Sequence, residues 1–205
     1  MTAPNGIVYV LDDEPEMVKA LTRLLRTKNF DVRGFTSVNH FLKSCDPTEL
    51  ACLVLDVAMP ELNGLVLQRR LKHHGILIPI IFLTGHGDIP MSVSAIKAGA
   101  TDFLTKPVNA AALVQAVTTA LQTAAALHHE IKESAASGAR LATLTVRERQ
   151  VMEHVVAGQL NKQIAAELGT GEQNIKVHRR HIMRKMGVES LAALVRAAAR
   201  LGIGR

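Results

Sequence analysis

The 205-residue chain contains only two cysteines, one tyrosine and no tryptophan. Two cysteines, Cys45 and Cys52, are too few for a disulfide framework, so a reducing compartment is expected. The longest apolar run, near Ile76–Leu83, contains Pro79 and is far shorter than the roughly 20 residues that span a bilayer. Residues Met1–Asn5 carry no basic cluster typical of a signal peptide. The sequence therefore predicts a cytoplasmic protein with no membrane segment.

Positive charge is unevenly distributed along the chain, whose formal net charge is +6. Residues 1–124 contain 11 basic and 11 acidic residues, whereas residues 140–205 contain 12 basic and 5 acidic residues. A balanced first part joined to a basic second part is typical of a nucleic-acid-binding module attached to another domain. A solvated basic surface explains the charge alone equally well.

Short apolar runs alternate with helical patterns up to about residue 108. The predicted strands are Ile7–Leu11, Phe30–Phe35, Cys52–Leu55, Pro79–Leu83 and Thr101–Leu104. The predicted helices between them are Pro15–Lys28, Val38–Ser44, Leu65–His73 and Met91–Ala98. Strands that alternate with helices form crossover units with parallel pairing. The first part is therefore predicted to be an α/β domain with a doubly wound, five-stranded parallel sheet of the flavodoxin-like kind.

Only helical patterns follow. An alanine-rich, helix-favouring segment runs from Asn109 to about Glu133, and small polar residues after it predict a linker near 134–142. Thr145 and Glu148 have the spacing of a capping box at the start of a helix. Four helices are predicted beyond the linker: Val146–Ala157, Lys162–Leu168, Glu172–Met186 and Leu191–Leu201. The chain thus divides into a first domain at 1–124, a helical extension and linker at 125–142, and an all-α domain at 143–205.

Polar residues follow the predicted strands at the positions where parallel sheets bind ligands. They are Asp12 and Asp13, then Asp56, then Thr84 and finally Lys106. Three converging carboxylates require a cation, so a hard divalent ion such as Mg²⁺ is implied. The Thr84 hydroxyl and the Lys106 ammonium suit phosphoryl oxygens. Each residue alone could be an ordinary turn or cap residue, but five such residues at the ends of four of the five predicted strands indicate a site.

Five segments of the first domain carry a specific combination of motifs. They are Val10–Glu14, Leu55–Pro60 with Gly64, Leu83–His86, Ala98–Ala100 and Phe103–Pro107. In this combination the first domain resembles the response-regulator receivers of two-component signalling, over essentially all of residues 5–124. The resemblance implies that Asp56 accepts a phosphoryl group from the histidine of a sensor histidine kinase. It also implies that Mg²⁺ is held by Asp12, Asp13, Asp56 and the backbone carbonyl of Ala58.

The same resemblance implies roles for three further residues. Lys106 would contact the phosphoryl group and form a cis peptide with Pro107, Thr84 would close on the phosphoryl group, and Phe103 would be the coupled aromatic switch. The protein would then not be an enzyme, except that it catalyses its own phosphoryl transfer and slow autodephosphorylation.

The predicted helix Glu172–Met186 has two chemically different faces. Ile175, His178, Ile182 and Met186 have the spacing of a buried stripe. The opposite side carries Gln173, Lys176, Val177, Arg180 and Arg184. A basic exposed face on the second helix of such a pair, after a tight turn at Gly169, predicts reading of the DNA major groove.

The second domain carries motifs of its own. They are Leu144–Val151, Gly158, Asn161–Ala165, Ile175–Arg179 and Lys185–Met186. Over about residues 141–203 they resemble the helix-turn-helix domain of LuxR/NarL/FixJ-type regulators, and the attached receiver indicates the FixJ-like branch. By this likeness the base contacts to double-stranded promoter DNA would be made by Lys176, Val177 and Arg180. The phosphate contacts would be made by Lys162, Gln173, Asn174 and Lys185. The turn Leu168–Gly171 and Asn174 depart from the usual pattern, which leaves the base preference open.

An alternative function is a Mg²⁺-dependent phosphatase or phosphotransferase that works through a phosphoaspartate. The sequence has no Asp-x-Asp pair with the nucleophile first and no lid segment, and this alternative leaves the basic domain unexplained. A second alternative is a helix-turn-helix protein that is controlled by a small apolar ligand. The charged residues at the strand ends suit phosphate and metal rather than such a ligand. A P-loop nucleotidase is excluded because no Gly-x4-Gly-Lys-Ser/Thr motif occurs.

Phosphorylation adds about two negative charges and three acceptor oxygens at one position. The unphosphorylated receiver is expected to keep the DNA-binding domain from pairing on its site. Phosphorylation is expected to remodel the face formed by Met91–Ala98, Thr101–Thr105 and the helix after Asn109, and so to favour a homodimer. The apolar helix Leu191–Leu201 is expected to help dimerise the DNA-binding part, and RNA polymerase is a candidate further partner.

Overall fold

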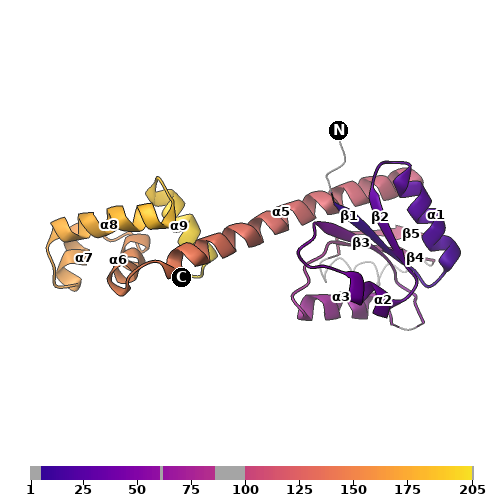
Figure 1. Cartoon of the computed structure of the whole chain (residues 1–205), viewed down its shortest axis with the longest axis horizontal. Coiled ribbons are helices and arrows are strands. Elements are labelled where there is room, and N and C mark those ends of the chain that lie inside the picture. Colours follow the sequence, from indigo (N-terminus) through magenta and orange to yellow (C-terminus); the bar gives the residue numbers. More distant parts are fainter. Residues whose placement is uncertain (1–5, 61, 86–99, 205) are drawn as a thin grey trace. The chain divides into compact units, whose positions relative to one another are not determined.

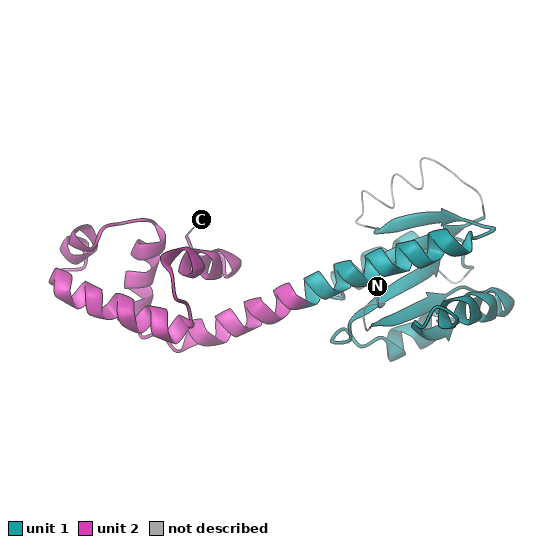
Figure 2. Cartoon of the chain, turned by 90° about the horizontal axis from the view of Figure 1, so that it is seen from above, with its two compact units in different colours: residues 1–128 teal, residues 129–205 magenta. Residues whose placement is uncertain are grey.

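A computed structural model of the chain describes residues 6–60, 62–85 and 100–204. The chain divides into two compact units, Met1–His128 and His129–Arg205 (Figure 2). The boundary between the units lies inside the segment expected to connect the two domains. Each unit is described by itself below.

The first unit is built on a five-stranded parallel sheet (Figure 1). Its strands are β1 (Ile7–Leu11), β2 (Asp31–Phe35), β3 (Ala51–Asp56), β4 (Ile80–Thr84) and β5 (Asp102–Thr105). They lie in the order β2-β1-β3-β4-β5, and every pairing is parallel. All residues of β1, β3 and β4 are buried, as expected for strands covered on both faces. The predicted α/β fold is confirmed, and the strand ends differ from the predicted ones by one residue.

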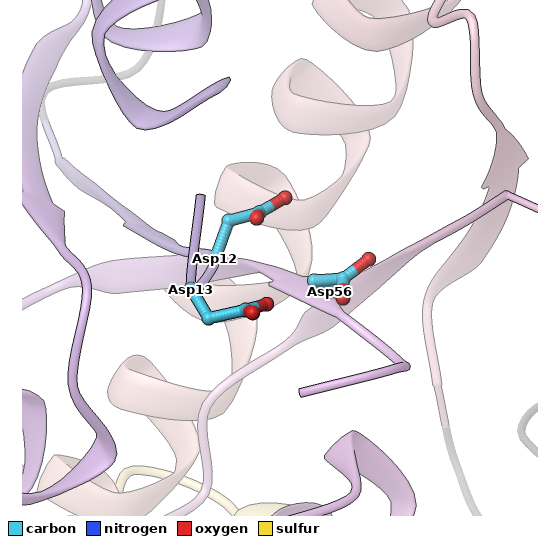
Figure 3. Close-up of side chains that lie close together, drawn as sticks. All are labelled: Asp12, Asp13 and Asp56. Carbon is cyan, nitrogen blue, oxygen red and sulfur yellow. The ribbon is translucent and has the colours of Figure 1, made fainter. Parts of the chain in front are cut away.

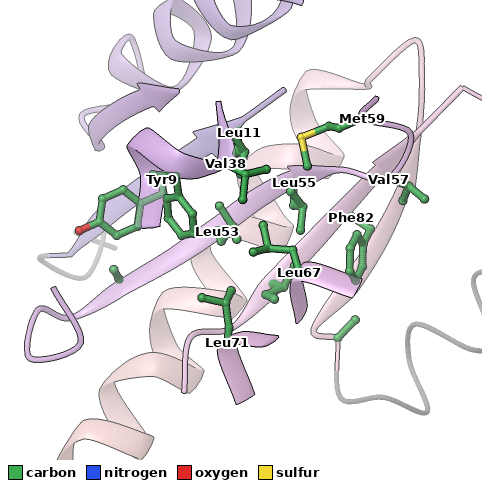
Figure 4. Packing of buried hydrophobic residues seen from close by; sticks show 14 of the residues in the cluster. Tyr9, Leu11, Val38, Leu53, Leu55, Val57, Met59, Leu67, Leu71 and Phe82 are labelled. Carbon is green, nitrogen blue, oxygen red and sulfur yellow. The ribbon is translucent and has the colours of Figure 1, made fainter. Parts of the chain in front are cut away.

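Two hydrophobic clusters cover the two faces of this sheet because successive strand side chains point to opposite faces. Tyr9 and Leu11 belong to one cluster, which Figure 4 shows, together with residues of α2 (Val38–Ser44) and α3 (Gly64–His73). Val8 and Val10 belong to the other cluster, together with residues of α1 (Pro15–Arg26) and α5 (Ala110–Ala142). The predicted helix Met91–Ala98 lies outside the described residues.

Helix α5 runs without interruption through the predicted linker. Residues 134–142, where the linker was expected, are helical to Ala142. Its alanines favour a helix, Ser137 is buried, and Leu141 packs against the core of the second unit. Among the described residues, α5 is the one helix that is long and apolar enough to cross a membrane. However, Leu113 and Leu121 are fully buried in the core of the first unit, as in the core helix of a globular domain.

The second unit contains the four predicted helices. They are α6 (Val146–Val156), α7 (Asn161–Glu167), α8 (Glu172–Met186) and α9 (Leu191–Arg200). The predicted capping box is confirmed: the Glu148 N–H donates to Thr145 Oγ1 at 3.2 Å, and the Thr145 N–H donates to Glu148 Oε2 at 2.8 Å. The core of the unit joins all four helices and includes Val151, Ile164, Ile175, Ile182 and Leu194.

Candidate functional site

Three carboxylates lie together at the carboxyl ends of two neighbouring strands (Figure 3). Asp12 and Asp13 directly follow β1, and Asp56 is the last residue of β3, which pairs with β1. One carboxylate oxygen from each residue lies within 4.8 Å of those of the other two. Asp12 and Asp56 are almost fully buried, at 1 % and 4 % exposure, whereas Asp13 is exposed. The parallel pairing therefore produces the convergence that the strand ends predicted.

Lys106 places one positive charge between two of these carboxylates. It directly follows β5, and its Nζ lies 2.8 Å from Asp12 Oδ2 and 2.8 Å from Asp56 Oδ1. Burial alone would lower the pKa of Lys106, but hydrogen bonds and Coulomb attraction from the two carboxylates outweigh burial, and its pKa is raised. The side chain is therefore held as an ammonium at this rim.

Backbone groups fix the orientation of the same carboxylates. Asp56 Oδ2 accepts a hydrogen bond from the Ala58 N–H at 3.0 Å, and Asp12 Oδ1 accepts one from the Glu14 N–H at 2.9 Å. Each of the two carboxylates thus has one oxygen bound to Lys106 and the other bound to the backbone. This arrangement positions the side chains before any ligand arrives.

Thr84 and Phe103 lie on the two strands that complete this side of the sheet. Thr84 is the last residue of β4 and is buried, and its carbonyl accepts a hydrogen bond from the Lys106 N–H at 2.7 Å. The peptide between Lys106 and Pro107 is cis, as the resemblance implied. Phe103 lies in β5, is partly buried, and has its ring centroid 6.4 Å from that of Phe82. The switch roles of Thr84 and Phe103 stay predictions.

The charge of the rim fits a divalent cation. Three carboxylates against one ammonium leave an excess of two negative charges within a few ångströms. Oxygen ligands and this charge suit Mg²⁺. The arrangement can therefore hold a divalent cation and, beside it, a phosphoryl group.

In the second unit, α8 has the two faces that its sequence predicted. Ile175, Ile182 and Met186 are buried, and His178 is partly buried. The residues expected to contact DNA are mostly exposed: Lys162, Gln173, Asn174, Lys176, Val177 and Arg180. The DNA contacts themselves stay predictions.

Lys185 has an intramolecular partner that the sequence did not reveal. Its Nζ lies 2.6 Å from Glu148 Oε2 and 3.2 Å from the Thr143 carbonyl oxygen, and so joins α8 to α6. Burial alone would raise the pKa of Glu148, but hydrogen bonds from Lys185 and Thr145 lower it to about 2. The prediction that Lys185 contacts a DNA phosphate did not take this ion pair into account. The sequence carried no signal for this pairing, because the capping box predicts only that Glu148 turns back toward its own helix start.

Two further hydrogen bonds stabilise the helix pair. Arg179, which was not assigned to a base, donates to Asn161 Oδ1 at 3.0 Å and so ties α8 to the first residue of α7. The Asn174 amide donates to Thr170 Oγ1 at 3.0 Å across the start of α8. Asn174 therefore has a local structural role in addition to its predicted phosphate contact.

Two family models match the chain. Residues 8–118 match the model described as "Response regulator receiver domain", and residues 142–198 match the model described as "Bacterial regulatory proteins, luxR family". The first match lies within the first unit and the second within the second unit, in agreement with the motifs of each part.

Relatives match almost the whole chain. Response regulator protein TodT of Pseudomonas putida is 45 % identical over 201 residues, which are 98 % of this chain and 88 % of TodT. Transcriptional regulatory protein FixJ of Bradyrhizobium diazoefficiens is 40 % identical over 97 % of both chains. A low-resolution structure of the response regulator StyR is 42 % identical, with a TM-score of 0.79 over 95 % of this chain and 98 % of StyR. This chain therefore belongs to the response regulators, as a transcriptional regulator that combines a receiver domain with a LuxR-type DNA-binding domain.

Proposed function

We propose that this response regulator accepts a phosphoryl group on Asp56 from a sensor histidine kinase and controls promoter binding in response. The observation that carries the proposal is the position of Lys106 Nζ, 2.8 Å from both Asp12 and Asp56, inside a group of three carboxylates. A phosphatase acting on external substrates is disfavoured, because the relatives are regulators and the second domain is of the DNA-binding LuxR type.

The residues that would hold Mg²⁺ are Asp12, Asp13, Asp56 and the carbonyl of Ala58. Their support is the excess of two negative charges at the rim. When bound, Mg²⁺ neutralises charge on the phosphoryl oxygens. The ion is therefore expected to be required for phosphorylation.

In the proposed transfer, an oxygen of Asp56 forms a bond to phosphorus while the bond from phosphorus to the kinase's histidine nitrogen breaks. The electron pair leaves with the histidine nitrogen. Lys106 binds the phosphoryl oxygens, because it already lies beside Asp56 Oδ1. Thr84 then closes on the phosphoryl group, and Phe103 turns inward. Slow hydrolysis of the acyl phosphate resets the receiver.

In the second domain, Lys176, Val177 and Arg180 contact bases. Phosphate contacts come from Lys162, Gln173 and Asn174, with Lys185 retained as a candidate despite its pairing with Glu148. Phosphorylation favours a homodimer, which the partly exposed apolar side chains of α9 support. The active dimer works in the cytoplasm on double-stranded promoter DNA, with RNA polymerase as a further partner.

The test is the intact mass of the natural protein and of the Asp56→Asn variant after incubation with Mg²⁺ and acetyl phosphate. We expect one phosphoryl group on the natural protein and none on the variant. Omission of Mg²⁺ should abolish the gain on the natural protein. Phosphorylation of the Asp56→Asn variant would show that the phosphoacceptor is a residue other than Asp56.

Two measurements test the response in the DNA-binding domain. Gel filtration should show a dimer after phosphorylation, and an unchanged mass would contradict the dimer model. Binding to DNA should weaken steeply with salt, because lysines and arginines displace condensed counterions. A salt-insensitive complex would contradict the proposed groove contacts.

A further inference from the structure

A groove on the receiver unit lies between α1 and β2, and its lining includes none of the carboxylates at the rim. It has a volume of about 630 Å³, and its lining includes Val18, Thr22, Arg23, Arg26 and Gly34. Strand β2 is one of the two edge strands, and in the described part of the chain no strand pairs with its second edge. Helix α1 lies alongside β2 (Figure 1). The groove is thus bounded by a helix and an open strand edge.

The backbone of β2 presents hydrogen-bonding groups to this open edge. The Phe35 carbonyl accepts from the Asp12 N–H at 3.3 Å on the side of β1, whereas the Val32 carbonyl accepts from Arg26 Nη2 at 2.9 Å. Backbone groups of successive strand residues point to alternate edges. Gly34 therefore faces the same open edge as Val32.

Helix α1 approaches β2 closely at Gly34. A Cβ at this position would lie 2.5 Å from Val18 Cγ1 and 3.2 Å from Thr22 Oγ1. Because glycine has no side chain, its exposed backbone remains open to a second chain. Among the described residues Thr22 Oγ1 is buried and has no hydrogen-bond partner, so a polar group of the groove wall is also unsatisfied.

The helix wall of the groove is cationic. Lys19, Arg23 and Arg26 recur at i, i+4 and i+7 and so share one face of α1. Glu16 pairs with Lys19 at 2.7 Å, but within the described ranges no carboxylate lies at ion-pair distance from Arg23 or Arg26. The charge of this wall therefore favours a negatively charged occupant.

We propose that this groove binds an extended, acidic segment of a partner protein, which adds to the open edge of β2 as a sixth strand. The backbone of Gly34 pairs with the added strand, and acidic side chains pair with Arg23 and Arg26. A peptide that adds to a sheet edge gains affinity from main-chain hydrogen bonds and specificity from side chains that alternate between two faces. The proposal does not depend on phosphorylation of Asp56.

The test uses the full chain and a fluorescein-labelled peptide of alternating valine and glutamate, with fluorescence anisotropy as the readout. One control peptide replaces glutamate by lysine. A second carries N-methyl groups on alternate backbone amides, which remove edge hydrogen bonds but keep the charges. The variant Arg23→Glu is compared with Arg196→Glu, which changes an exposed arginine of α9. Backbone NMR of the labelled protein reports the Gly34 amide.

We expect saturable binding of the glutamate peptide, a shifted Gly34 amide, and binding about tenfold weaker for Arg23→Glu but not for Arg196→Glu. Both control peptides should fail to saturate. Equal binding of the N-methylated peptide, or competition by inorganic tripolyphosphate at the same concentration, would show a general anion site and overturn the added strand. Binding without a Gly34 shift, or no binding at all, would also overturn the proposal.

Discussion

Each of the two units contains a lysine whose ammonium lies against buried carboxylates, but the charges balance in only one of them. In the receiver unit, Lys106 Nζ lies 2.8 Å from both Asp12 and Asp56, within a group of three carboxylates. In the DNA-binding unit, Lys185 Nζ lies 2.6 Å from a single carboxylate, that of Glu148. Burial is similar in the two places, because Asp12, Asp56 and Glu148 are all at most 4 % exposed.

The number of carboxylates for each lysine distinguishes the binding site in the receiver unit from the structural ion pair in the DNA-binding unit. Glu148 is matched one to one by Lys185 and also serves the capping box of α6, so the pair joins two helices. The receiver rim keeps an excess of negative charge, which suits the proposed Mg²⁺. Variants that remove each lysine should therefore have different consequences.

The largest expected effect is on stability, in the variant Lys185→Met. Glu148 would remain buried without its counter-charge, which should lower the free energy of unfolding of the DNA-binding unit by about 3 kcal/mol. Urea denaturation followed by the NMR signals of α8 amides measures this change. The matched control is Lys176→Met on the exposed face of α8, with an expected change below about 0.5 kcal/mol. Equal stability of the two variants would contradict a structural role for Lys185.

The second prediction concerns the rate of phosphorylation in the variant Lys106→Met. Loss of the ammonium beside Asp56 should slow phosphorylation by acetyl phosphate about 100-fold, because a fixed charge no longer stabilises the phosphoryl oxygens. A time course of intact mass measures the rate, with Lys72→Met on the exposed surface of α3 as control. The stability of the DNA-binding unit should stay unchanged. A phosphorylation rate equal to that of the natural protein would contradict the proposed role of Lys106 in phosphoryl transfer.

The same comparison shows what the sequence could predict. The rim was predictable because Asp12, Asp56 and Lys106 each follow a strand, and parallel pairing brings strand ends to one edge. The pairing of Lys185 with Glu148 was not predictable, because it joins two helices whose packing a single helical wheel does not contain. A helical wheel of α8 predicts which of its residues are buried and which are exposed. It does not predict which residues of the other helices they contact.

Helix α5 shows a different limit. Small polar and alanine residues at 134–142 suit both a flexible linker and a helix. Composition alone therefore does not determine whether this segment is helical. Burial of Ser137 and the contact of Leu141 with the second core decide in favour of a helix. This information lies in residues far from the segment, so the sequence of the segment alone does not contain it.

The third prediction uses pH to separate the two lysine pairs. The pKa of Glu148 is lowered from 4.5 to about 2, so its pair contributes stability above pH 4.5 and loses it as the pH falls toward 2. The stability difference between the natural protein and Glu148→Gln should shrink by about 1–2 kcal/mol from pH 7 to pH 3, measured by urea denaturation. The pKa of Lys106 is raised by its two carboxylate partners, so the contribution of its ammonium is present at lower pH and is lost as the pH rises through the folded value. A constant difference for Glu148→Gln across acidic pH would contradict the assigned pair.

The smallest expected effect concerns the start of α8, which lacks the side-chain cap that α6 and α9 have. Thr145 and Ser190 accept hydrogen bonds from the backbone at the starts of α6 and α9, whereas Gly171 offers no side chain at the start of α8. Gly171 has φ −84° and open space around a Cβ, so Gly171→Ser should stabilise the DNA-binding unit by about 0.5 kcal/mol. The matched control is Gly169→Ser, which should destabilise the unit by about 1 kcal/mol, because φ is +63° at that position. Since neither change touches the receiver rim, phosphorylation should be unaffected. If both variants changed the free energy of unfolding in the same direction and by the same amount, the missing cap would not be what limits the stability of α8.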